Sequence, residues 1–171
     1  DHMGRFIREQ LERESVDTKG VRTDKERLTA LVLLGIRDDH SFPLIFYRSQ
    51  CADAALDESD IDEVHIAAAR AIVVTGTHFS LTNTAAAQNK AIDIARRYKR
   101  RVVFDIDYRP NLWGLAGHDD GEGRYIASGR VSEPLKEILP RCDLIVGTEE
   151  EIHILGGTTD TIAALRAIPQ A

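Results

Sequence analysis

Two aspartates and an arginine alternate near the middle of the chain, in the run Asp105-Ile106-Asp107-Tyr108-Arg109. If this run continues the strand predicted before it, alternate side chains project on the same side, and Asp105, Asp107 and Arg109 lie together. Two carboxylates and a guanidinium at one edge could hold a cation and an anionic group, as phosphoryl transfer requires. The same residues could equally form a polar strand end whose aspartates cap the next loop, and the spacing alone does not decide.

A second polar segment, Thr148-Glu149-Glu150-Glu151, follows a predicted strand directly and begins a predicted helix. Threonine followed three residues later by glutamate is the pattern of a capping box, with Thr148 as N-cap and Glu151 reaching back to it. A helix N-terminus can also face phosphate, with a carboxylate near a metal ion. The capping box is the favoured interpretation from the spacing, and the two roles are compatible.

The third candidate is Arg48, at the end of the run Phe46-Tyr47-Arg48. Strand alternation places Phe46 and Arg48 on one face and Tyr47 on the other. An arginine beside an aromatic ring could bind a substrate carboxylate through two parallel N–H groups. Without further context, an exposed arginine on the edge of a hairpin is the favoured interpretation.

Strands and helices that alternate along the sequence must position these segments. Two β-like runs, 28–36 and 44–48, predict an antiparallel hairpin after a first helix over 5–14. Beyond residue 60 the pattern predicts strands over 71–75, 101–107 and 143–146, and helices over 83–100, 127–139, 148–155 and 159–168. Strands that alternate with helices imply an α/β fold with a parallel sheet covered on both faces.

Ligands of such sheets bind at the carboxyl ends of the strands. This rule selects the loops 75–80, 105–110 and 147–151 as the candidate site. In the first of them, Gly76 and Ser80 either allow a close approach of two backbones or begin the next helix.

The bulk composition argues against several classes of protein. The 171 residues carry a formal net charge of -6, and no long basic run suggests a nucleic-acid binder. Cys51 and Cys142 lie far apart, which favours a reducing cytoplasm, and the six histidines show no zinc-ligand spacing. No apolar stretch approaches the ~20 residues that cross a bilayer, so a membrane partner is not expected.

Taken in order, these segments resemble the ribokinase-like sugar kinases of the PfkB family over nearly the whole chain. The first helix and the turn after it resemble the family's first conserved helix, with Ser15 in place of the usual glycine. The run 105–113 resembles a family stretch Asp-x-Asn-x-Arg-Pro, with Asp107 where asparagine is more common. The run 148–151 stands in the place of an Asn-x-x-Glu motif, with Thr148 replacing the asparagine.

Four runs together, 46–48, 51–56, 105–113 and 146–151, resemble the 5-dehydro-2-deoxygluconokinase branch of this family. The resemblance implies a ribokinase-like α/β fold, with a mostly parallel sheet flanked by helices on both faces and a small β-hairpin lid. It divides the chain into a core, 1–20 and 49–171, and a lid, 21–48. It also implies magnesium- and ATP-dependent transfer to the 6-hydroxyl of 5-dehydro-2-deoxygluconate.

The resemblance assigns roles to single residues as well. Arg48, on the lid, is expected to meet the substrate carboxylate, and Arg109 to stand near the transferred phosphoryl group. Three residues are expected to line the sugar: Phe46, Tyr47 and Asp107. Three more are expected to organise phosphate and magnesium, through water rather than by direct ligation: Thr148, Glu151 and Asp105.

The family's Gly-Ala-Gly-Asp segment does not occur in the sequence. That segment supplies the general-base aspartate and the backbone amides of the anion hole. It is expected beyond Ala171, just as a first strand and a Gly-Gly-Asn region are expected before Asp1. We therefore expect this chain to be an internal fragment that has no kinase activity by itself.

Two other functions fit the same residues. One is a kinase of the same superfamily for 2-keto-3-deoxygluconate or fructose. The other is a truncated, non-catalytic module that binds a ligand or dimerises through the lid. The expected partners are accordingly a sugar acid, ATP and, through the lid, a second copy of the chain.

Overall fold

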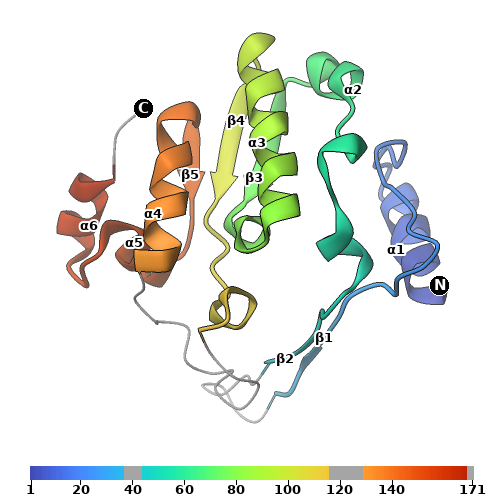
Figure 1. Cartoon of the computed structure of the whole chain (residues 1–171), viewed down its shortest axis with the longest axis horizontal. Helices are drawn as coiled ribbons and strands as arrows, with labels where there is room; N and C mark the ends of the chain where they lie inside the picture. Colours follow the sequence, from blue (N-terminus) through green and yellow to red (C-terminus); the bar gives the residue numbers. More distant parts are fainter. Residues whose placement is uncertain (37–43, 116–128, 169–171) are drawn as a thin grey trace.

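Two separate sheets form the framework of the protein. The structure is a computed structural model that describes residues 1–36, 44–115 and 129–168. The antiparallel hairpin consists of β1 (Leu31–Leu34) and β2 (Leu44–Tyr47), and the parallel sheet of β3 (Ala71–Thr75), β4 (Arg101–Asp105) and β5 (Leu144–Val146). The hairpin lies beyond the carboxyl ends of the parallel strands (Figure 1). The predicted α/β class, parallel sheet and hairpin are confirmed.

Helices connect the parallel strands, as the sequence pattern predicts. The helices are α1 (His2–Arg13), α2 (Glu63–Ala68), α3 (Thr82–Arg97), α4 (Gly129–Ile138), α5 (Glu149–Gly156) and α6 (Thr161–Ala167). Short 3-10 helices add η1 (Ala52–Ala55), η2 (Glu58–Asp60), η3 (Gly76–Ser80), η4 (Pro110–Trp113) and η6 (Leu139–Arg141). Of these, η3 directly follows β3, and η4 comes shortly after β4, at the carboxyl ends of the strands, where ligands of parallel sheets bind.

The core lies between one face of the parallel sheet and the helices. Val74 on β3, and Val102 and Phe104 on β4, point to this face with their side chains buried. The rings of Phe79 and Phe104 pack edge to face, with their centroids 6.3 Å apart. Helix α3 packs on this face through a buried stripe that includes Ile92. Burial of such side chains is the main stabilising term of the fold.

The opposite face of the sheet is accessible in the part of the chain that the structure describes. The strand register places Val73, Val103 and Leu144 side by side on this face, followed by Val146. Val73 is 66% exposed and Leu144 54% exposed. The helices that flank the sheet within the described ranges therefore cover the face that carries Phe104.

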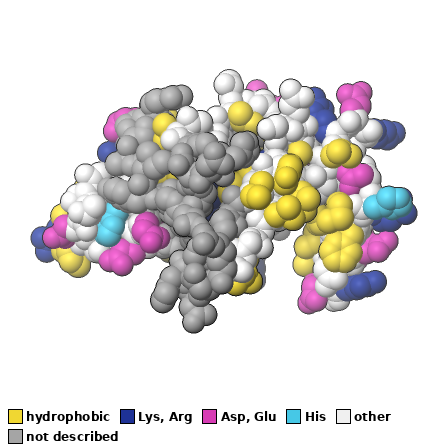
Figure 2. All heavy atoms as spheres, turned by 90° about the horizontal axis from the view of Figure 1, so that it is seen from below, with side chains coloured by type: hydrophobic (Ala, Val, Ile, Leu, Met, Phe, Trp, Pro, Cys, Tyr) yellow, Lys and Arg dark blue, Asp and Glu magenta, His cyan; other side chains and the backbone are white. Residues whose placement is uncertain are grey.

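Hydrophobic side chains are also exposed on the hairpin and α1. They gather on the side of the molecule that carries these two elements (Figure 2). The exposed set comprises Met3, Phe6 and Ile7 on α1 and Leu31, Val32, Leu33, Leu34, Ile45 and Tyr47 on the hairpin. Both faces of the hairpin are therefore apolar and accessible within the described residues.

Several element ends differ from the predicted ones, and backbone conformation explains them. Helix α3 ends at Arg97 rather than Arg100, because Lys99 has a φ of 55°. Helix α1 begins at His2 because the Asp1 side chain accepts a hydrogen bond from the Gly4 N–H at 2.9 Å. After α1, Ser15 has a φ of 63°, in the left-handed region that favours the glycine it is expected to replace.

Candidate active site

The three predicted loops meet at the carboxyl ends of the parallel strands. The Ile106 N–H donates to the Val146 carbonyl at 2.9 Å, which joins the second loop to β5. A Cβ atom added to Gly76 would stand 2.1 Å from the Ile106 carbonyl oxygen, so only glycine allows this approach. The close-approach interpretation of Gly76 is confirmed, and η3 begins at the same residue.

Asp107 is held by contacts from two sides. The Thr77 hydroxyl lies 2.6 Å from the Asp107 carbonyl oxygen and 2.8 Å from its Oδ2. On the other side, Arg109 Nη2 lies 2.8 Å from Asp107 Oδ1. The predicted reason for this grouping was wrong, because β4 ends at Asp105 and Asp107 has a φ of 34°. The left-handed backbone of Asp107 after the end of β4, not strand alternation, accompanies the contact between the aspartate and the arginine.

Glu151 links the end of β4 to the start of α5. Its Oε1 accepts from the buried Tyr108 N–H at 2.8 Å and lies 3.5 Å from Arg109 Nη1. Its Oε2 accepts from the Thr148 N–H at 2.8 Å, and Thr148 Oγ1 accepts from the Glu151 N–H at 3.4 Å. The predicted capping box is confirmed. Since both carboxylate oxygens are engaged, Glu151 is suited to contact a metal ion through water rather than directly.

Three carboxylates and one guanidinium therefore surround the end of β4. Burial, followed by the nearby charges of Asp107 and Glu151, raises the pKa of Asp105 above its ordinary value. A cation close to Asp105 would relieve this unfavourable arrangement. Among residues 1–36, 44–115 and 129–168, no group of three or more His, Cys, Asp or Glu side chains is arranged to hold a metal ion directly.

A cavity of about 280 Å³ opens beside this cluster. Its lining comes from the end of the hairpin, from η1 and η3, and from the segment that follows β4, and includes Phe46, Arg48, Asp53, Thr77, His78 and Asn111. Tyr47 does not line it but borders a larger apolar hollow against α1. Arg48 lines only the smaller cavity, which agrees with its predicted facing away from Tyr47, whereas Phe46 borders both spaces.

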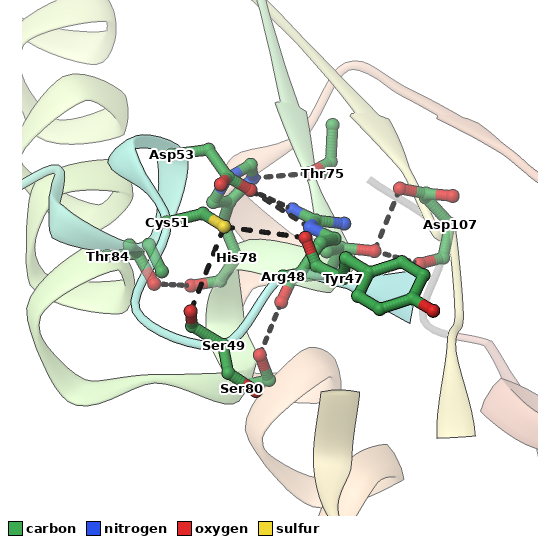
Figure 3. A network of polar contacts seen from close by, with 12 residues as sticks. Tyr47, Arg48, Ser49, Cys51, Asp53, Thr75, His78, Ser80, Thr84 and Asp107 are labelled. Atoms are coloured by element: carbon green, nitrogen blue, oxygen red, sulfur yellow. Dashed lines mark hydrogen bonds and ion pairs between the residues drawn. The ribbon is translucent and has the colours of Figure 1, made fainter. Parts of the chain in front are cut away.

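Arg48 is paired inside the cavity rather than exposed on the hairpin edge. Its Nε donates to Asp53 Oδ2 at 3.0 Å, and its Nη2 bonds the same oxygen. The Arg48 side chain is only 20% exposed. The exposed-arginine interpretation was therefore wrong, because the chain turns back after β2 and brings η1 against its end. Figure 3 shows the Asp53 carboxylate facing the Arg48 guanidinium, with His78 next to Asp53.

His78 stands beside the Arg48–Asp53 pair. Its Nδ1 lies 3.1 Å from the Thr75 hydroxyl. Burial, followed by the charge of Arg48, lowers the pKa of His78 below its ordinary value. The cavity therefore contains a neutral imidazole at neutral pH.

This lowered pKa predicts a loss of stability in mild acid. As the pH falls through about 6.5, the unfolded chain takes up a proton at residue 78 before the folded protein does, so the folded state loses stability. The loss is complete below the folded-state pKa. In urea unfolding at pH 7.5 and 5.5, His78→Gln is expected to reduce the pH dependence. His2→Gln, at an exposed position, is the matched control; an equal effect of both variants would contradict the assignment.

Three residues of this site were missed in the sequence: Asp53, Thr77 and His78. Thr77 and His78 belong to a loop that the strand-end rule had selected, but nothing in their spacing pointed to specific partners. Asp53 comes five residues after Arg48, and their contact depends on the turn between β2 and η1. An aspartate shortly after a strand-end arginine was the available signal.

Comparison with known proteins decides the family. Residues 1–171 match the pfkB family carbohydrate kinase model. The chain belongs to the pfkB family. A relative from Geobacillus kaustophilus, 5-dehydro-2-deoxygluconokinase, is 35% identical over 156 residues, covering 91% of this chain and 43% of the relative. A protein of the same name from Bacillus velezensis is 30% identical over 173 residues, covering 98% of this chain and 49% of the relative.

Solved pfkB family structures have the same fold. A PfkB protein from Polaromonas sp. JS666 superposes with a TM-score of 0.81 at 25% identity, covering 98% of this chain and 53% of that one. A fructokinase from Xylella fastidiosa with bound ATP superposes with a TM-score of 0.76 at 19% identity, covering 95% of this chain and 47% of that one. This chain thus spans about half the length of its relatives, and the resemblance to a ribokinase-like kinase is confirmed at the level of family and fold.

Proposed function

We propose that the protein carrying this chain is an ATP-dependent kinase that phosphorylates the 6-hydroxyl of 5-dehydro-2-deoxygluconate. The observation that carries the proposal is Arg48, a guanidinium held inside a cavity of about 280 Å³ next to the strand-end cluster. A carboxylate on the substrate is the natural partner of such a group. Relatives at 30–35% identity named 5-dehydro-2-deoxygluconokinase support the choice of sugar acid.

Within this proposal the cavity binds the sugar and the cluster faces the phosphoryl group. Phe46 provides an apolar wall, Arg48 binds the carboxylate, and Asp107 accepts a hydrogen bond from a sugar hydroxyl. Tyr47 borders the hollow on the other side of β2 and does not line this cavity. Its expected contact with the sugar stays a prediction.

The cofactors in this proposal are ATP and magnesium. The residues present fit a hydrated cation, since burial and neighbouring carboxylates already raise the pKa of Asp105. Asp105 and Glu151 would orient its water molecules, and Thr148 would hold Glu151 in place through the capping box. When bound, magnesium and ATP supply the transferable phosphoryl group and neutralise part of its charge. Arg109 stabilises negative charge from the protein side.

The first experiment compares Arg48→Ala with the unchanged full-length protein. Phosphoryl transfer from ATP would be assayed with 5-dehydro-2-deoxygluconate, 2-keto-3-deoxygluconate and fructose. Loss of a hydrogen-bonded charge contact should lower kcat/KM for the preferred acid about 100-fold, and that for fructose much less. Arg27→Ala removes a surface ion pair with Asp24 and is the matched control.

The outcomes separate the possible functions. A preference of the unchanged protein for fructose would reject the sugar-acid proposal and leave the family. The 171-residue chain, assayed alongside, is proposed to be inactive because it lacks a Gly-Ala-Gly-Asp segment. If a pure sample of this chain hydrolysed or transferred ATP phosphate in a reaction that depends on a sugar acid, the proposed inactivity of the chain would be overturned.

Two further parts of the proposal concern location and assembly. A homodimer through the hairpin is supported by its exposed apolar faces, which include Val32 and Leu33. A cytoplasmic location is supported by Cys51 and Cys142, both buried free thiols. Among the described helices, none is long and apolar enough to cross a membrane.

A further inference from the structure

The contact between Arg48 and Asp53 uses only one side of the guanidinium. Arginine carries five N–H groups in a rigid planar fork. Nε and Nη2 both bond the same oxygen, Asp53 Oδ2, which occupies the side edge of the fork. Among the described residues, no protein hydrogen bond is found at the end edge, which is formed by Nη1 and the second N–H of Nη2. In the described part of the chain, no protein acceptor is found for Nη1.

The end edge has the geometry that a carboxylate requires. Two parallel N–H groups at the end of an arginine match the two oxygens of a carboxylate and bond them together. Arg48 lines the cavity, and so does Asp53. The side edge therefore fixes the orientation of the guanidinium, while the end edge is available for a ligand.

Asp53 belongs to a segment that neighbouring elements hold in place. It belongs to η1, where the Ala52 N–H donates to the Leu28 carbonyl at 2.9 Å. From α3, Asn83 Nδ2 donates to the Ala54 carbonyl at 2.8 Å and to the Leu56 carbonyl at 3.0 Å. Arg48 directly follows β2 of the hairpin. The ion pair thus attaches the end of the hairpin to a segment that α3 holds in place.

The second carboxylate oxygen of Asp53 takes no part in the pair. Asp53 Oδ1 is shielded from solvent and has no hydrogen-bond partner among the residues that the structure describes. The carboxylate therefore receives its side-chain hydrogen bonds through Oδ2 alone, and both come from Arg48. The Asp53 side chain is 29% exposed, so only its shielded oxygen is affected, and such an unpaired atom in a stable protein calls for an explanation.

We propose that Asp53 is a positioning residue that makes the cavity selective for sugar acids, because it holds the side edge of Arg48 and thereby presents the end edge to the substrate carboxylate. This inference rests on the proposed function and adds a residue that determines its specificity. Asp53 acts through Arg48 and does not touch the reacting atoms. Its removal should therefore weaken binding of the acid and leave turnover at saturation nearly unchanged.

The test uses the full-length protein with Asp53→Ala, Asp53→Asn, Arg48→Ala and the double variant Arg48→Ala/Asp53→Ala. For the preferred sugar acid, Asp53→Ala should raise KM about 30-fold and change kcat less than about twofold. Asp53→Asn keeps one oxygen acceptor and the same shape, so its KM should rise only about threefold. In the Arg48→Ala background, Asp53→Ala should have almost no further effect, since interacting residues are not additive.

Each alternative result has a definite meaning. A lower KM for the acid in Asp53→Ala would show that Asp53 competes with the substrate for Arg48, and would overturn the proposal. Additive effects in the double variant, or equal losses of kcat on acidic and neutral sugars, would also overturn it, because they indicate a structural role. Failure of the unchanged protein to phosphorylate any sugar acid would instead reject the proposed function itself. If Asp53→Ala does not fold, Asp53→Asn and its combination with Arg48→Ala still decide the question.

Discussion

Replacing Glu151 with alanine is expected to destabilise the protein by about 3–5 kcal/mol. Glu151 is 8% exposed, and its two carboxylate oxygens accept from the N–H groups of Tyr108 and Thr148. Without the carboxylate, the buried Tyr108 N–H loses this acceptor, which alone costs about 1–3 kcal/mol. The capping box is lost as well, which adds about 1 kcal/mol. Arg109 also loses one of its two carboxylate partners.

Urea unfolding would measure this effect, with Glu150→Ala as the matched control. Glu150 lies in the same first turn of α5 but is exposed, so its loss should cost less than about 1 kcal/mol. Glu151→Gln keeps one oxygen acceptor, so its loss of stability should lie between those of Glu150→Ala and Glu151→Ala. A cost for Glu151→Ala no greater than that for Glu150→Ala would mean that the bridge between β4 and α5 does not stabilise the fold.

The parallel sheet could be predicted closely because its signals are local. The run of β-branched residues in Ala71–Thr75 gave β3 with both ends correct. The helix after it was predicted over 83–100 and is observed over Thr82–Arg97. Its C-terminal end was missed because basic residues favour helix by composition, whereas Lys99 adopts a left-handed conformation that composition does not reveal. The division into a core, 1–20 and 49–171, and a lid, 21–48, stays a prediction.

The candidate site was predictable in its location but not in its contacts. The rule that ligands bind at the carboxyl ends of parallel strands selected the right loops from the order of elements alone. The pairings depend on backbone turns, such as the positive φ of Asp107, and on segments that meet across 30 or more residues, as Thr77 and Asp107 do. Neither the backbone conformation at one residue nor a contact between distant segments follows from the spacing of residue types in one sequence.

Arg48 and Arg109 illustrate how two similar side chains acquire different tasks. Arg48 is held by one carboxylate beside the cavity, whereas Arg109 contacts Asp107 at 2.8 Å and Glu151 at 3.5 Å. The Arg109 Nη1 also donates to the Tyr108 carbonyl at 2.9 Å. With three contacts at the end of β4, Arg109 is held in a fixed orientation. Such preorganisation is what stabilisation of a transition state requires.

Replacing Arg109 with alanine in the full-length protein is therefore expected to lower kcat about 1,000-fold for every sugar that the protein phosphorylates. KM for the sugar should change little, because the proposed role of Arg109 concerns charge that develops on the transferred phosphoryl group. Arg109→Lys keeps the charge but loses the planar fork, so its kcat should lie between those of the unchanged protein and of Arg109→Ala. Steady-state kinetics with a saturating sugar acid would measure these values.

Arg101→Ala is the matched control, because Arg101 begins the same strand at its opposite end and is exposed. It lies 3.9 Å from Asp143 on the surface, and its loss should leave kcat unchanged. Loss of Arg109 also leaves Asp105, Asp107 and Glu151 without their shared cation, so thermal unfolding of each variant must be measured to separate folding from catalysis. If Arg109→Ala folds normally and kcat falls less than about tenfold, Arg109 does not stand near the phosphoryl group, and its role is confined to holding Asp107 and Glu151 together.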